Sequence, residues 1–254
     1  MTMQDRYVGD AGDFPKYGLL RRLVGKSGER PIRVGVVWCL FPDETHNNDG
    51  RHVSYLHRPE FKKLDDPLLT ALRKIVTSGN RCVAAVSSGA LLPGNTVFCD
   101  AAASAPKALR LSPDERVHYR AGWLDQCFAL TEKCDLVFFD PDNGLEIASV
   151  PKRHPNAGKY VYWDELTPFW RRGQTLLVYH HLNRTMSAGR QIHGLRDRFR
   201  AKLDSAMVLP LVFRRGSCRI FWLVYRDSAL GAEMDCRARD FLSSGWFNHF
   251  WPID

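Results

Sequence analysis

The amino-acid sequence predicts an α/β fold with a mostly parallel sheet, helices on both faces and an antiparallel hairpin near the C-terminal end. Apolar runs of strand length alternate with segments whose apolar residues recur at helical spacing, a pattern typical of parallel sheets. Two late strand-like runs are joined by Arg-Gly-Ser, which is a hairpin signature. The 254 residues are 44% hydrophobic and 25% charged, the composition of an ordinary globular protein. We predict a single domain over residues 1–254, with residues 41–80 as a candidate insertion between the first two strands.

Strands are predicted where apolar, β-branched and aromatic residues follow one another between turn residues. In chain order these segments are 32–40, 81–87, 96–101, 116–123, 135–140 and 174–182, followed by the two hairpin strands at 206–215 and 218–226. Helices are predicted where apolar residues recur every three or four positions. These segments are 15–26, 67–76, 123–132 and 190–203. Residues 159–170 are expected to form a strand or a loop rim and then a short helix.

Several classes of protein are disfavoured by the same sequence. Apolar runs such as 34–40 are too short to span a bilayer, and the first residues do not resemble a signal peptide, so we expect a cytoplasmic protein. The seven cysteines are scattered without a Cys-x-x-Cys motif, which argues against a disulfide framework and a structural zinc site. Buried, reduced thiols are expected instead.

Polar residues follow several of the predicted strands. Ligands of open α/β sheets bind outside the carboxyl ends of the strands, so these residues are expected to converge along one edge. The segments are 41–44, 87–89, 140–144 and 180–184. Asp, Asn, Pro and Gly are also the usual turn residues, so each segment alone is equally compatible with an ordinary turn.

The segment Asp140-Pro141-Asp142-Asn143-Gly144 admits three interpretations. It is a plain turn, in which Pro141 sets φ and Gly144 supplies a positive φ. It is an amine or cofactor pocket, in which Asp140 accepts hydrogen bonds from an amine while Asn143 and Gly144 shape the pocket. It is a metal site, in which Asp140, Asp142 and Glu146 offer oxygen ligands to Mg²⁺.

The adjacent His180 and His181 are candidates for proton transfer near neutral pH. Neighbouring residues of a strand point to opposite faces, so both enter one pocket only if the strand has already ended. One of the two is therefore expected in the core or at the surface, and the other near the site.

Basic residues concentrate in the second half of the chain. Ten Lys or Arg lie between Arg184 and Arg226, against Asp197 and Asp204, and the whole chain has a formal net charge of +8. Such an excess attracts a polyanion, although a solvated basic surface gives the same pattern. The arginines predicted to contact nucleic-acid phosphates are Arg184, Arg190, Arg196, Arg198 and Arg200.

Three segments together resemble a known enzyme family. AGDFPKYGLL (11–20) resembles an N-terminal strap of the type AGNFADVLKH. LLPGNTVFCDA (91–101) resembles the segment before that family's second strand, and DLVFFDPDNGLE (135–146) resembles its strand and loop LIDPPFE. In this order they are similar to the 23S ribosomal RNA adenine-N6 methyltransferases of the J type. The chain also resembles a group of bacterial proteins that share the DPDNGLE and YHHLNR motifs.

The resemblance implies a Rossmann-like methyltransferase fold that binds S-adenosylmethionine and methylates an amine, expected in a nucleic acid. Asp140 matches the catalytic-loop aspartate, and Lys16 matches the lysine of the strap. The residues expected on the cofactor side are Lys16, Trp38, Asp43, Ser87 and Gly144. Two departures are visible in the sequence. Asp142-Asn143 replaces a proline and an aromatic residue, and Pro42-Asp43-Glu44 replaces a glycine-rich turn after the first strand.

Two alternatives remain open at this point. One is a Mg²⁺-dependent nuclease or other phosphodiesterase built on Asp140, Asp142 and Glu146. The other is a non-catalytic nucleic-acid-binding domain that retains only the fold.

Overall fold

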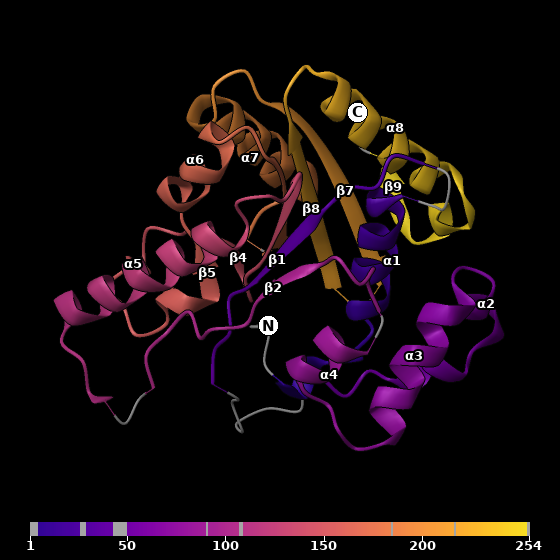
Figure 1. The fold of residues 1–254 in the computed structure, drawn as a ribbon. Coiled ribbons are helices and arrows are strands. Elements are labelled where there is room, and N and C mark those ends of the chain that lie inside the picture. Colours follow the sequence, from indigo (N-terminus) through magenta and orange to yellow (C-terminus); the bar gives the residue numbers. More distant parts are fainter. Residues whose placement is uncertain are drawn as a thin grey trace.

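A single seven-stranded sheet forms the centre of the molecule (Figure 1). This computed structural model describes residues 5–25, 29–42, 50–89, 91–106, 109–183, 185–215 and 217–252. The strands of the sheet are β1 (Val34–Trp38), β2 (Val97–Cys99), β3 (Leu136–Asp140), β6 (Thr175–His181), β7 (Met207–Arg215), β8 (Ser217–Tyr225) and β9 (Phe250–Pro252). Their order in the sheet is β2-β1-β3-β6-β8-β7-β9.

The pairing confirms the predicted fold class. Strands β2, β1, β3 and β6 are parallel neighbours. Strand β8 is antiparallel to both β6 and β7, so the C-terminal hairpin continues the parallel sheet. Strand β9 adds an antiparallel edge next to β7 that the sequence did not predict. The sheet is therefore of the Rossmann-like, methyltransferase type expected from the sequence.

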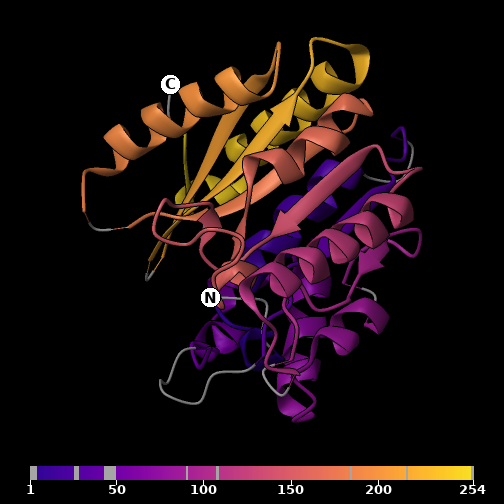
Figure 2. The same cartoon turned by 90° about the vertical axis from the view of Figure 1, so that its left-hand side faces the viewer.

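Helices cover both faces of the sheet. One face carries α1 (Asp13–Val24), α3 (Asp66–Thr77), α4 (Val83–Ser88) and α8 (Ala229–Ser243). The other carries α5 (Pro113–Leu130), α6 (Trp163–Arg171) and α7 (Ala188–Lys202), and Figure 2 looks onto this side. The remaining short elements are η1 (Asp5–Tyr7), η2 (Ser54–His57), α2 (Pro59–Lys62), β4 (Gly144–Leu145), η4 (Ala157–Lys159), β5 (Tyr160–Val161) and η5 (Gly245–Asn248).

Two predicted strands are wrong, because both segments are helical. Residues 81–87 fall largely in α4, where Val83 and Val86 share the buried side. Residues 116–123 lie inside α5, which begins at a capping box formed by Ser112 and Glu115. A serine cap followed by proline and two acids starts a helix strongly enough to override the strand-like alternation of the residues after it.

The excursion between β1 and β2 packs onto the same core as α1 and α8. Phe61 and Leu72 are buried there, and the Phe61 ring lies 5.8 Å from the ring of Phe14. The described part of this excursion, residues 50–80, therefore extends one face of the sheet.

All seven cysteines are free thiols. Four are buried as expected, whereas Cys82 and Cys218 are partly exposed and Cys236 is exposed. Among the described helices, none is long and apolar enough to cross a membrane.

Candidate functional site

The strand order reverses between β1 and β3, because the chain builds β2 on one side of β1 and β6 on the far side of β3. Such a switch point opens a crevice at the carboxyl ends of the strands, where open α/β sheets bind their ligands. The segments after β1, β2 and β3 meet at this edge. It is the edge at which the sequence analysis predicts a ligand site.

Asp140 ends β3 and lies at the centre of a buried ionic network. Its Oδ2 accepts a hydrogen bond of 2.8 Å from Lys16 Nζ, which also donates to Asp13 Oδ1 at 2.9 Å. Asp13 Oδ2 accepts from the Gly9 amide at 2.9 Å. All three charged side chains are almost completely buried. The N-terminal segment that was predicted to strap the sheet edge is thus tied to the end of β3.

The network changes the proton affinity of its members. Burial raises the pKa of Asp140, and the charge of Lys16 opposes that rise. Burial acts to lower the pKa of Lys16, but the charges of Asp13 and Asp140 outweigh it, so the pKa of Lys16 is raised. Lys16 therefore stays protonated, and Asp140 accepts a proton more readily than an ordinary aspartate.

Arg219 of β8 contacts the N-terminal segment, at Asp10 and Gly12, from the far side of the site. Its guanidinium lies 4.0 Å from Asp10 Oδ2 and packs against the backbone of Gly12, where an added Cβ would lie 3.2 Å away. Burial raises the pKa of Tyr179, and a hydrogen bond with Arg219 opposes that rise. Sequence reasoning missed Arg219, although a lone arginine inside an otherwise apolar strand is a recognisable signal.

The loop after Asp140 is held against β6. The Asn143 amide donates to the Lys159 carbonyl at 2.9 Å, and the His181 amide donates to the Asn143 carbonyl at 3.2 Å. Gly144 has a φ of +109°. A Cβ at this position would lie 2.2 Å from His180 Nδ1. Only glycine fits here, so the steric restriction explains why the DPDNGLE motif has a glycine at position 144.

The two histidines face opposite sides of the sheet, as their strand alternation predicts. His180 is buried, its Nδ1 accepts from the Leu145 amide at 3.0 Å, and burial lowers its pKa to about 4. It is therefore neutral and holds the loop. His181 lies opposite Arg219 in the β6–β8 pairing and is partly exposed. Of the pair, His181 is on the Asp140 side of the sheet and remains the candidate for proton transfer.

The three carboxylates of the metal alternative have separate partners. Asp140 binds Lys16, whereas Asp142 Oδ2 lies 3.7 Å from Lys159 Nζ. Glu146 Oε2 accepts from the Trp163 amide at 3.4 Å. Across the described part of the chain, no three His, Cys, Asp or Glu side chains are grouped so that they could hold a metal ion. The geometry gives no support to the Mg²⁺-dependent alternative.

A cavity of about 190 Å³ lies where the segments after β1, β2 and β3 meet the first turns of α5. Its lining residues are Phe41, Pro42, Ala103, Ser104, Ala105, Pro106, Arg110, Leu111, Arg116, Arg120, Lys152, His154, Pro155, Asn156 and Ala157. The lining contains basic side chains and no carboxylate. Lys159 links the cavity to the Asp140 loop, because its ammonium lies 5.1 Å from the centre of the Phe41 ring and 3.7 Å from Asp142.

A buried ion pair supports one wall of this cavity. Arg120 Nε and Nη2 donate to the two oxygens of Glu165 at 2.6 and 2.8 Å. The same guanidinium donates to the Ala157 carbonyl at 3.0 Å and the Tyr160 carbonyl at 2.6 Å. Arg120 therefore fixes residues 157–160 to α5 and α6.

The residues predicted for the cofactor do not gather in one pocket. Trp38 is fully buried and stacks on Phe98 with 6.0 Å between ring centres. Ser87 lies in α4 and donates to the Val83 carbonyl at 3.3 Å, so it does not follow a strand. Asp43 lies outside the described residues. Conversely, sequence reasoning missed Asp100, which is exposed directly after β2, where dinucleotide-binding sheets place the carboxylate that binds ribose.

The predicted phosphate contacts on α7 are mostly exposed. Arg190, Arg198 and Arg200 point to solvent, and Arg196 is partly buried. The guanidinium of Arg198 lies 5.2 Å from the centre of the Trp163 ring. Arg184 lies outside the part of the chain that the structure describes.

Comparison of the chain with protein-family models, with curated proteins and with solved structures finds no match.

Proposed function

We propose that this chain is an S-adenosylmethionine-dependent methyltransferase that methylates an amine in a nucleic acid. The observation that carries the proposal is the position of Asp140. It ends β3 at the switch point of the sheet, and the loop after it is linked through Lys159 to the cavity on the α5 side. Asp140 also matches the catalytic-loop aspartate of the family that the sequence resembles.

The residues around the cavity fit the parts of this cofactor. Phe41, Pro42 and Ala103 offer an apolar wall for a purine ring. Asp100 is not part of the lining, but it directly follows β2, where dinucleotide-binding sheets place the carboxylate that binds ribose. The basic lining suits a carboxylate. The cavity is smaller than the roughly 300–1,000 Å³ of complete ligand pockets, so it accommodates part of such a molecule. When bound, S-adenosylmethionine would supply an activated methyl group.

The protein's own groups would orient the acceptor. Asp140 would accept hydrogen bonds from the amine and direct its lone pair, while Lys16 keeps the buried carboxylate in place. The raised pKa of Asp140 suits it to receive the proton that the amine loses after methylation. His181, on the same face of the sheet, would pass that proton to solvent.

Calorimetry with S-adenosylmethionine and transfer of a labelled methyl group to single-stranded oligonucleotides test the proposal. We expect Asp140→Asn to lower kcat by about 100- to 1,000-fold while the cofactor Kd changes by less than about threefold. Asp135→Asn is the matched control, because Asp135 precedes the same strand at its opposite end and binds the Arg33 amide at 2.9 Å. A wild-type chain that binds no S-adenosylmethionine, or an Asp140→Asn variant of normal rate, would contradict the proposal.

A further inference from the structure

We propose that the basic rim of the cavity binds a phosphate of the nucleotide substrate, so that the substrate approaches over α5 and residues 152–154 and not along α7. We define the cavity rim as the lining residues Arg110, Arg116, Lys152 and His154, together with Arg153, which lies between Lys152 and His154 in the sequence. The link to the reacting amine rests on the proposed function, whereas phosphate binding by the rim is independent of it.

The charge of the lining points to an anion. Arg110, Arg116, Lys152 and His154 line the cavity, and none of its lining residues is acidic. The nearest acids of α5, Asp114 and Glu115, lie with His118 and Tyr119 on another side of its first turns. A cofactor carboxylate would need one or two of the cations Arg110, Arg116 and Lys152, so the rim retains positive charge for a second anion.

Two rim cations are available to a ligand. Arg110 and Arg153 are exposed, and within the described residues neither side chain makes a hydrogen bond or an ion pair. Arg116 is held more firmly, since it donates to the carbonyls of Arg153 and Leu111. Lys152 pairs with Asp164, whose side chain is 71% exposed, and also lies 3.6 Å from Oε1 of the buried Glu165, so a phosphate could replace Asp164 but not Glu165.

The backbone of Arg110 adds a second, independent observation. Its φ is +46°, in the left-handed region that residues other than glycine, asparagine and aspartate rarely adopt. Arg110 is exposed, so burial of its side chain does not compensate for this conformation. Backbone strain retained at a polar residue on the mouth of a cavity is typical of a ligand contact.

The apolar part of the lining favours an anion that belongs to a nucleotide. Apart from the Phe41–Pro42 wall that suits the purine of the cofactor, Pro106 and Pro155 give the lining two flat apolar surfaces, which suit a base beside the cations that suit its phosphate. A small inorganic anion would use only the rim. The combination selects a phosphate-bearing nucleotide, either free or in a strand.

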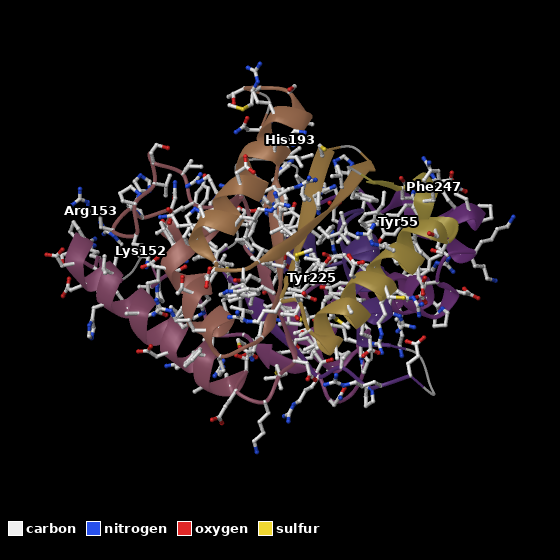
Figure 3. The ribbon with its side chains drawn as sticks, turned by 90° about the horizontal axis from the view of Figure 1, so that it is seen from above. Tyr55, Lys152, Arg153, His193, Tyr225 and Phe247 are labelled. Atoms are coloured by element: carbon white, nitrogen blue, oxygen red, sulfur yellow. The ribbon has the colours of Figure 1, made fainter. Side chains whose placement is uncertain are left out.

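The geometry favours this rim over α7. Residues 110–116 and 152–154 follow β2 and β3, so they lie at the same carboxyl edge as Asp140. Arg190, in the first turn of α7, also lies near that edge, but α7 leads away from it, so Arg200 lies about 15 Å farther along the helix. Figure 3 shows Lys152 and Arg153 beside α5, on a different side of the molecule from His193 of α7.

Fluorescence anisotropy with a labelled single-stranded oligonucleotide, without cofactor, tests the inference. We compare the wild-type chain with Arg110→Gly/Arg153→Ala and with Arg190→Ala/Arg200→Ala. The second pair is a matched control, because it also removes two exposed arginines. We expect the rim variant to raise Kd about tenfold and to reduce the slope of log K against log salt by about 1.4, the value for two phosphate contacts. We expect the α7 variant to change Kd by less than about twofold.

Competitors identify the source of the phosphate. Displacement by adenosine 5′-monophosphate but not by adenosine supports the inference and indicates a free nucleotide. Displacement only by longer oligonucleotides also supports it and indicates a strand. Loss of binding in the α7 variant alone, unchanged binding in both variants, or no binding by the wild-type chain would overturn it. Calorimetry of the wild-type chain with S-adenosylmethionine reports cofactor binding alone. It therefore separates failure of this inference from failure of the proposed function.

Discussion

At the scale of single residues, Gly144 and His180 fix each other's position where the Asp140 loop meets β6. A side chain at residue 144 would collide with the imidazole, and φ there is +109°. We expect Gly144→Ala to reduce the free energy of unfolding by about 2–5 kcal/mol, since it adds overpacking to backbone strain. Gly173→Ala is the control. Gly173 has a φ of +90° with no atom near its Cβ position, so strain alone should cost about 1 kcal/mol. Equal losses of stability in urea titrations would contradict the steric explanation.

His180 also makes the fold sensitive to acid. Its pKa falls from 6.5 to about 4 on folding, so the unfolded chain binds the proton more readily. The stability contributed by neutral His180 is complete above pH 6.5 and is lost as the pH falls toward 4, by up to about 3 kcal/mol. We expect His180→Asn, which retains an acceptor for the Leu145 amide, to flatten this part of the stability profile measured by urea unfolding. His193→Asn, at an exposed position of α7, should leave the profile as in the wild-type chain.

At the scale of elements, Arg120 of α5 holds the cavity wall through Glu165 of α6. Both side chains are buried, so Arg120→Ala leaves an uncompensated carboxylate and should reduce the free energy of unfolding by about 3–5 kcal/mol. The double variant Arg120→Met/Glu165→Leu should recover most of this loss, because it removes both charges. The exposed pair Arg239–Asp235, 2.6 Å apart, is the comparison, and Arg239→Ala should cost less than about 1 kcal/mol. If Arg120→Ala also reduced the free energy of unfolding by less than about 1 kcal/mol, the Arg120–Glu165 ion pair would not stabilise the cavity wall.

The elements that were predicted correctly and incorrectly differ in a physical way. Strands β1, β3 and β6 are buried apolar runs bounded by turn residues, and they were found from the sequence. The strands predicted at 81–87 and 116–123 are wrong because short apolar or alternating runs suit either structure, and the capping box at Ser112 starts a helix before the second segment. The sequence located Asp140 and Lys16 separately. Their ion pair spans 124 positions, and the cavity is assembled from four segments, so neither follows from local patterns.

At the scale of the whole molecule, one sheet carries two buried cores. The core under α1, α3 and α8 includes residues from both the excursion and the strands, such as Leu72 and Leu177. The core under α5, α6 and α7 shares the same strands from the other side. Because β1, β3 and β6 contribute to both, disrupting one core removes the support of the other.

This arrangement predicts that residues 51–79 unfold together with the sheet as one cooperative unit. We expect a single calorimetric transition whose calorimetric and van't Hoff enthalpies agree. Leu72→Ala in α3 and Leu177→Ala in β6 each remove a fully buried side chain from the same core, so each should cost about 2–5 kcal/mol. Both should lower the midpoint of that one transition, by about 2–4 °C for each kcal/mol. If Leu72→Ala instead produced a separate early transition and left the main one in place, the excursion would be an independent unit, and the packing of Phe61 against Phe14 would be too weak to couple it to the sheet.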